Sequence, residues 1–295
     1  MRYHPFVMLT ATARRTELWR LALGLGFVLA VSFVLGQFLF GLIMLLVPAD
    51  RTAALVQAVR DADAPPGMLL LLLSMGTLGV GAALAARVLH DRAPVTLVGP
   101  PPLALAQFLR CAAAAGLAAL LGAALMVWAV DEPLHPGLPM LRWLALLPLT
   151  LPAILIQTAS EELFFRGYLQ SQLAARLPQP WVWLSLPSAL FALGHYAPGT
   201  YGSAAPTVVI WAFLFGVAAA DLTARSGTLG PAIALHFMNN IVALALVSPE
   251  GDMSGLALFR WPFALGDTEA LARMLPMDLV TLLVSWLAAR LALRR

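Results

Sequence analysis

The sequence is poor in charge, and this shortage excludes a soluble protein. Charged residues make up 11% of the 295 residues and hydrophobic residues 61%, and the mean hydropathy is +0.85. Soluble domains carry about 25% charged residues, which help to cover their surface with polar groups. The composition therefore indicates an integral membrane protein.

The chain contains one cysteine, Cys111, which excludes an internal disulfide. No histidine lies near Cys111 in the sequence, and an isolated cysteine usually packs as a small hydrophobic side chain. The HExxH motif of many zinc proteases is also missing. The sequence therefore predicts neither a cysteine nucleophile nor a zinc site of that type.

Lysine is absent, and all 18 basic residues are arginine. This bias is typical of GC-rich bacterial genomes, so we expect the cytoplasmic (inner) membrane of a bacterium. Most of the arginines lie in short loops and at the chain ends, where topology rules for membrane proteins place positive charge. The net charge of +3 therefore does not predict binding to nucleic acid.

Eight apolar runs approach or exceed the length of about 20 residues that a helix needs to cross a bilayer. None shows the ten-residue alternation of a membrane β-barrel, and only helices or closed barrels satisfy the backbone in lipid. We therefore expect an all-α membrane protein with about eight transmembrane helices. The runs cover residues 18–47, 68–89, 103–130, 141–176, 181–196, 206–222, 229–247 and 275–293.

The charged loops predict which ends of the helices face the cytoplasm. Arginines occupy both chain ends and follow the second, fourth and sixth runs, whereas the other loops contain acids. Because cytoplasmic loops are rich in arginine, we expect both termini in the cytoplasm and an even number of crossings. The arginines are Arg2, Arg14, Arg15, Arg20, Arg87, Arg92, Arg176, Arg225, Arg290, Arg294 and Arg295, and the acids are Asp61, Asp63, Asp131, Glu132, Glu250 and Asp252.

Two adjacent acids and an arginine, Glu161, Glu162 and Arg166, lie inside the fourth run. Ionisable residues at this depth are costly in lipid and therefore suggest a functional site. Glu162 and Arg166 are four residues apart on one helix face, so we expect them to form an ion pair. Glu161 points about 100° away and has no local cation. It is therefore our candidate for a general base.

Two more pairs with helical spacing lie in apolar sequence, namely Phe191 with His195 and His236 with Asn240. His195 is a candidate to share a proton with Glu161 or to hold water, and Phe191 to shape and dry the pocket. His236 and Asn240 share one helix face, where an imidazole and an amide are suited to stabilise an oxyanion.

The depths of these residues predict that they meet. At about 1.5 Å per residue, Glu162 and His195 both lie about 21 Å from the hairpin between the fourth and fifth runs. His236 and Asn240 lie about 17 and 22 Å beyond Arg225, which is at the same side of the membrane. Three helices should therefore bring these side chains into one layer.

The three motifs EExxxR, FxxxH and HxxxN occur in this order inside predicted spans. The combination resembles the CPBP family of intramembrane proteases, which includes the CAAX proteases, the bacteriocin-processing enzymes and the Rce1-like enzymes. The resemblance covers about residues 141–247. It divides the chain into N-terminal transmembrane helices (1–140), a catalytic core (141–247) and an outer interfacial segment with the last transmembrane helix (248–295).

The resemblance implies hydrolysis of a peptide bond in a membrane-associated peptide or membrane protein, which can be lipidated. It implies that Glu161 and His195 activate water and that His236 and Asn240 form the oxyanion hole. Glu162, Arg166 and Phe191 would then support the site.

Members of this family are also described as metalloproteases, so zinc is an alternative cofactor. Glu161, His195 and His236 would supply three ligands, but asparagine is a poor zinc ligand. That set would also leave the role of base to Glu162, which we expect to be paired with Arg166. We therefore favour a mechanism without metal.

Two other functions are compatible with intramembrane acids. A proton-coupled transporter would use them to carry protons, but the first half of the chain contains no repeat of the Glu161 cluster. A non-catalytic immunity or partner-binding membrane protein would be expected to have lost a motif residue, and this chain retains all of them.

Overall fold

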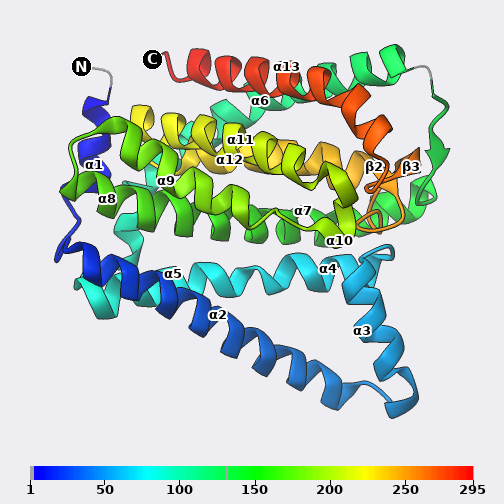
Figure 1. Ribbon diagram of the computed structural model, residues 1–295, viewed down its shortest axis with the longest axis horizontal. Coiled ribbons are helices and arrows are strands. Elements are labelled where there is room, and N and C mark those ends of the chain that lie inside the picture. The colour runs from blue at the N-terminus through cyan, green and yellow to red at the C-terminus, as the bar shows by residue number, and fades with distance from the viewer. Residues whose placement is uncertain (1–2, 131, 295) are drawn as a thin grey trace.

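The computed structural model describes residues 3–130 and 132–294 and consists mainly of helices (Figure 1). Arg2, Asp131 and Arg295, which carry part of the predicted charge pattern, lie outside the described residues. The chain is an all-α multi-pass membrane protein, as the sequence predicted. The α-helices are α1 (Val7–Thr10), α2 (Leu18–Leu46), α3 (Thr52–Asp61), α4 (Pro65–Ser74), α5 (Gly76–His90), α6 (Pro101–Val130), α7 (Met140–Glu162), α8 (Ser171–Arg176), α9 (Pro180–Leu193), α10 (Pro198–Tyr201), α11 (Ala205–Ser226), α12 (Gly230–Asn240) and α13 (Thr268–Ala292).

Short helical segments of other types connect or continue these helices. Two of them are π-helical, η4 (Leu163–Gln170) and η6 (Ile241–Leu246). The other four are 3-10 turns, η1 (His4–Phe6), η2 (Ala49–Arg51), η3 (Pro94–Leu97) and η5 (Gly202–Ala204). Because η4 joins α7 to α8 without a break, the fourth predicted run forms one continuous helix.

All eight predicted runs form helices, but the helices differ in length. Among the described residues, six helical stretches are long and apolar enough to cross a membrane. Two further apolar helices are shorter, α9 and the continuous pair α12 and η6. Their lengths are about 21 and 25 Å, against about 30 Å for the hydrocarbon core of a bilayer. Both helices are therefore shorter than the hydrocarbon core of a bilayer.

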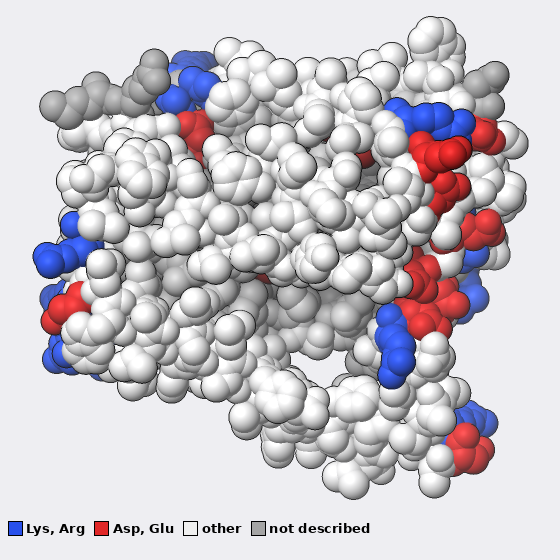
Figure 2. Space-filling model, viewed as in Figure 1, with Lys and Arg blue, Asp and Glu red and all other residues white. Residues whose placement is uncertain are grey.

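The charged side chains gather at two ends of the molecule, and the band between them is almost free of charge on the face shown (Figure 2). Both chain termini lie at one end, with the last turns of α5, α8 and α11; we call it the terminal end (Figure 1). The α3–α4 connection and the strands lie at the other end, which we call the distal end. This arrangement agrees with the even number of crossings predicted from the loops.

The helices approach most closely where small residues face each other. α5 packs against α7, and a Cβ atom on Gly79 would lie 2.8 Å from Oγ of Ser160. A glycine at this position therefore lets α5 lie directly against the helix that carries the acid pair. α2 packs mainly on α5 and leaves Phe33, Phe38 and Leu46 exposed, as expected for a helix that faces lipid.

Three short strands at the distal end form a small sheet that the sequence did not predict. β3 (Phe259–Ala264) pairs antiparallel with β1 (His135–Pro136) and parallel with β2 (Val247–Glu250). Strands this short show too few alternations for a period of two to be recognised. Residues 253–265, which belong to the predicted outer interfacial segment, lie at the distal end and contain β3.

Arg92, in the loop after α5, holds the N-terminal segment against the bundle. Its guanidinium donates hydrogen bonds to the carbonyl of Leu9 at 3.0 Å, to Oγ1 of Thr12 at 3.1 Å and to Oγ of Ser171 at 2.7 Å. Burial lowers the pKa of Arg92 to about 10, so the side chain keeps its charge at neutral pH. The terminal end is therefore a packed structure rather than a set of free loops.

Candidate active site

The acid pair lies where α7 changes into a π-helix. Glu161 and Glu162 are the last two residues of α7, and η4 continues the same helix to Gln170. Both acids are buried. π-Helical turns inside longer helices are rare and occur frequently at functional sites.

Glu162 and Arg166 form the ion pair that their spacing predicts. Nη1 of Arg166 donates to Oε1 of Glu162 at 3.0 Å, and both side chains are fully buried. Nη2 of Arg166 donates to the carbonyl of Gly216 on α11 at 3.1 Å. The guanidinium therefore neutralises Glu162 and links α7 to α11.

His236, on α12, lies between the two acids. Its Nδ1 is 2.9 Å from Oε1 of Glu162, and its Nε2 is 3.8 Å from Oε2 of Glu161. An ionised carboxylate only accepts hydrogen bonds, so Nδ1 carries the proton in the bond to Glu162. The rings of Phe191 and Phe215 contact the imidazole edge to face, at centroid distances of 5.8 and 5.0 Å. The orientation of the imidazole is thus fixed on several sides.

The two oxygens of Glu161 differ in their surroundings. Oε1 accepts a hydrogen bond from Nε2 of Gln157, one turn earlier on α7, at 2.8 Å. Oε2 is buried and accepts no hydrogen bond from a described residue, and Nε2 of His236 lies 3.8 Å from it. Oε2 of Glu162 is also buried without a hydrogen bond, but Oε1 of Glu162 is paired with Arg166. Among the described residues, Glu161 is therefore the acid of the pair that forms no ion pair with an arginine. The sequence analysis missed Gln157, although its position four residues before Glu161 was a usable signal.

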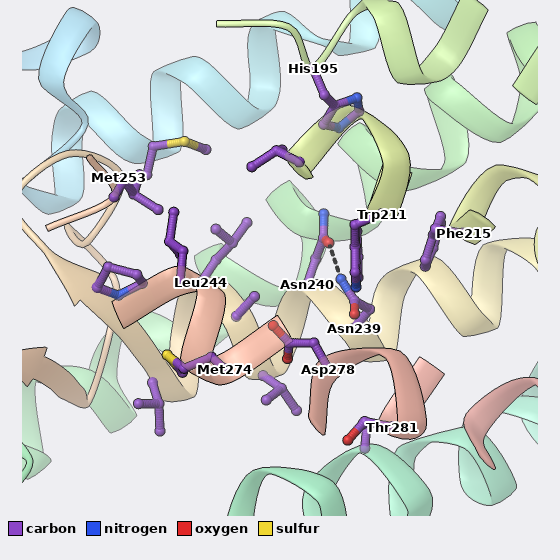
Figure 3. A pocket seen from close by; sticks show the side chains of 18 of the residues that line it. His195, Trp211, Phe215, Asn239, Asn240, Leu244, Met253, Met274, Asp278 and Thr281 are labelled. Carbon is purple, nitrogen blue, oxygen red and sulfur yellow. Dashed lines mark hydrogen bonds between the residues drawn. The ribbon is translucent and has the colours of Figure 1, made fainter. Parts of the chain in front are cut away.

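Asn240 is held by two neighbouring amides. Its Nδ2 donates to Oε1 of Gln157 at 2.8 Å, and its Oδ1 accepts from Nδ2 of Asn239 at 3.2 Å (Figure 3). One hydrogen of the Asn240 amide therefore goes to Gln157, and the other is left for another acceptor. Asn239 was also missed, because it lies outside the HxxxN spacing.

His195 lies two residues beyond the end of α9, in the turn that leads to α10. Its Nδ1 is 2.9 Å from the carbonyl of Phe191, to which it donates, and the two rings are 4.5 Å apart. Among the described residues His195 makes no hydrogen bond to Glu161. It lines the same cavity as Glu161, His236 and Asn240, and its role in activating water stays a prediction.

Residues 143–242 match the family model described as type II CAAX prenyl endopeptidase Rce1-like. We call this matched segment the Rce1-like domain. The match confirms the resemblance to the CAAX protease family and supports a CAAX-type intramembrane endopeptidase in general terms. No curated protein and no solved structure matches the chain.

The Rce1-like domain contains every site residue proposed from the sequence, but it supplies only part of the cavity next to them. The cavity has a volume of about 500 Å³ and is lined on one side by the polar side chains described above. Part of the remaining wall comes from α11, and the rest comes largely from α4, α6, α13 and the distal strands, which lie outside the matched segment. It is largely apolar and includes Leu72, Met126, Trp261, Met274 and Leu275 (Figure 3 shows part of it). The cavity thus extends from Glu161 towards the distal end.

The donor groups of the Rce1-like domain do not fit a zinc site with three protein ligands. In the described part of the chain, no three histidine, cysteine or acidic side chains are arranged to hold a metal ion. Glu162 is committed to Arg166 and His236, and Nδ1 of His195 to a backbone carbonyl. The metal-free mechanism stays a prediction.

Proposed function

We propose that the Rce1-like domain hydrolyses a peptide bond of a membrane-associated peptide or protein, with Glu161 as the general base. The observation that carries this proposal is the buried, uncommitted Oε2 of Glu161, with Nε2 of His236 at 3.8 Å. The other acid, Glu162, is already neutralised by Arg166. Glu161 is therefore free to accept a proton from a water molecule that enters the cavity.

In the proposed reaction, Glu161 takes a proton from water while the water oxygen attacks the carbonyl carbon of the scissile bond. A tetrahedral intermediate with a negative oxygen forms. Glu161 then gives its proton to the nitrogen of the leaving amine as the C–N bond breaks, so the carboxylate is restored. General-base catalysis of this kind contributes about 10²–10⁴-fold to the rate.

His236 and Asn240 are assigned to stabilise the oxyanion. The bond from Nδ1 to Glu162 orients the imidazole, which in its protonated form donates from Nε2. The bond to Gln157 orients the amide of Asn240, whose second hydrogen is available. Donors that are fixed before the reaction need little reorganisation, which makes them effective in stabilising developing charge.

His195 is assigned to hold the attacking water. Its Nδ1 donates to the carbonyl of Phe191, so in the neutral ring Nε2 accepts a hydrogen bond. Phe191 also contacts His236 and excludes solvent from that side.

The apolar cavity wall favours a substrate with apolar groups beside the scissile bond. We propose a peptide precursor or another membrane protein, with or without a lipid group, as the substrate, in a bacterial inner membrane. The arginine-rich terminal end would then face the cytoplasm.

The proposal is tested by offering purified protein in lipid nanodiscs a prenylated peptide and the same peptide unmodified, each with and without a chelator. We expect cleavage of at least one peptide, with no loss of rate in the chelator. Boiled protein is the control. Loss of activity in the chelator that zinc restores would replace the metal-free mechanism with the zinc-dependent alternative. Absence of cleavage together with substrate-coupled proton uptake into vesicles would favour the transporter.

A further inference from the structure

Asp278 is an acid of the cavity that lies outside the Rce1-like segment. It is ten residues into α13 from Thr268, which places it about 15 Å along the helix and near the middle of the membrane layer. Its side chain lines the cavity together with Asn239 and Met274 (Figure 3). An ionisable side chain at this depth is costly and suggests a function.

Asp278 has no partner in the described part of the chain. It makes no hydrogen bond and no ion pair there, whereas the arginines on the same helix are engaged elsewhere. Arg273 pairs with Glu132 at 3.8 Å, and Arg290 lies over the ring of Trp286 at 4.7 Å. A role in joining helices would require a polar partner on a neighbouring helix. Helix packing therefore does not explain why a carboxylate is present at this position.

A row of polar side chains leads from the general base towards Asp278. Gln157 bonds to Glu161, Asn240 to Gln157, and Asn239 to Asn240. Asn239 and Asp278 line the same cavity (Figure 3). Nearby wall residues, among them Trp211, Met274 and Leu275, are apolar. A substrate bound along the row would therefore meet a single negative charge beyond the amides.

We propose that Asp278 forms a substrate subsite for a cationic side chain, lysine or arginine, in an otherwise apolar peptide. The inference rests on the proposed peptidase function. A cation would neutralise the carboxylate in surroundings of low dielectric constant, where a charge pair is stronger than in water. The aliphatic stem of lysine or arginine would lie along the apolar wall. Asp278 would thereby select the substrate without taking part in the chemical step.

The test measures binding to the Glu161→Gln variant in nanodiscs, so that hydrolysis is not required. The probes are N-acetylated, fluorescently labelled apolar peptides that differ only at one position, which carries lysine, norleucine or glutamate. Acetylation removes the terminal amine as a second source of positive charge. We expect the lysine peptide to bind about ten-fold more tightly than the norleucine peptide, a ratio typical of one partly buried charge pair.

Two further variants, both made in the Glu161→Gln background, identify the residue responsible. Asp278→Asn should remove the preference for lysine while the norleucine peptide binds as before. Glu269→Gln removes a charge from the exposed distal end of the same helix and should leave the preference intact. Equal binding of lysine and norleucine peptides to the Glu161→Gln protein, or a preference that survives Asp278→Asn, would overturn the inference. Selective binding without hydrolysis by the wild type would instead contradict only the proposed function.

Discussion

At the scale of single residues, the site depends on two neighbouring acids with different partners. Glu162 is neutralised by Arg166 and bonded to His236, whereas Glu161 is held by the neutral amide of Gln157. A fully buried ion pair loses much more when one partner is removed than an exposed pair does, because the remaining charge cannot be solvated. Loss of the ion pair of Glu162 should therefore mainly lower stability, whereas a change at Glu161 should mainly lower catalysis.

Arg166→Met should destabilise the protein by about 3–5 kcal/mol, because it leaves Glu162 buried without its cation. Thermal unfolding in detergent, followed by circular dichroism, measures the effect. The matched control is Arg87→Met, which breaks a pair of the same i,i+4 spacing with Asp91 at the exposed terminal end. We expect little change there. Equal shifts of the unfolding temperature in the two variants would show that the buried pair stabilises the protein no more than the exposed pair.

Gln157→Leu should lower kcat by about ten- to hundred-fold with little change in KM, because Gln157 positions both Glu161 and Asn240. Steady-state cleavage of a peptide substrate measures both constants. Thr158→Val is the control, since it removes a buried hydroxyl from the same helix that only bonds to its own backbone. A normal kcat in Gln157→Leu would contradict a positioning role.

The sequence predicted the ion pair of Glu162 and Arg166 because both residues lie on one helix, where spacing fixes geometry. The distances from His236 to both acids depend on how α12 packs against α7, and depth alone could place these residues only in one layer. The hydrogen bond from Asn240 to Gln157 could not be predicted either, because it also depends on how α12 packs against α7. The catalytic roles of these residues remain predictions.

At the scale of elements, the contact between α5 and α7 sets the position of the acid pair. Gly79 faces Ser160, the residue directly before Glu161, with no room for a side chain. Small residues of this kind allow close helix packing in membranes.

Gly79→Leu should therefore push α5 away from α7 and cost about 1–3 kcal/mol in stability, which is typical of overpacking. It should also lower activity. Gly36→Leu on α2 is the control, because a Cβ atom there meets nothing within 4 Å. The unfolding temperatures of the two variants are compared in the same detergent. A Gly79→Leu protein that is as stable and active as the wild type would contradict the role assigned to the contact between α5 and α7.

The ends of the elements were harder to predict than their existence. The apolar run 181–196 continues past the end of α9 into a turn around His195, because the residues of that turn carry no loop-like polarity even though Leu193 and Tyr196 are exposed. Apolar composition alone does not distinguish a helix from an apolar turn at membrane depth.

At the scale of the whole molecule, two charged ends enclose an apolar band, and the cavity lies towards the distal end. Because the terminal end carries the arginines that predict the cytoplasmic side, the cavity should be reached from the opposite side of the membrane. This prediction concerns access and does not depend on catalysis.

Labelling of single cysteines with a membrane-impermeant maleimide tests the prediction, in a Cys111→Ala background expressed in bacterial spheroplasts. Thr207→Cys, which lines the cavity, should react in intact spheroplasts, as should the exposed distal Asp252→Cys. Arg176→Cys at the terminal end should react only after permeabilisation. Reaction of Thr207→Cys only after permeabilisation would place access to the cavity on the other side.

The central claim, that Glu161 activates the hydrolytic water, is tested most directly by the turnover of the Glu161→Gln variant. The substitution keeps the size of the side chain and removes the basic oxygen. We predict that kcat falls by about 10²–10⁴-fold, the usual contribution of a general base, while the unfolding temperature stays close to that of the wild type. Wild-type turnover by a folded Glu161→Gln protein would contradict the claim.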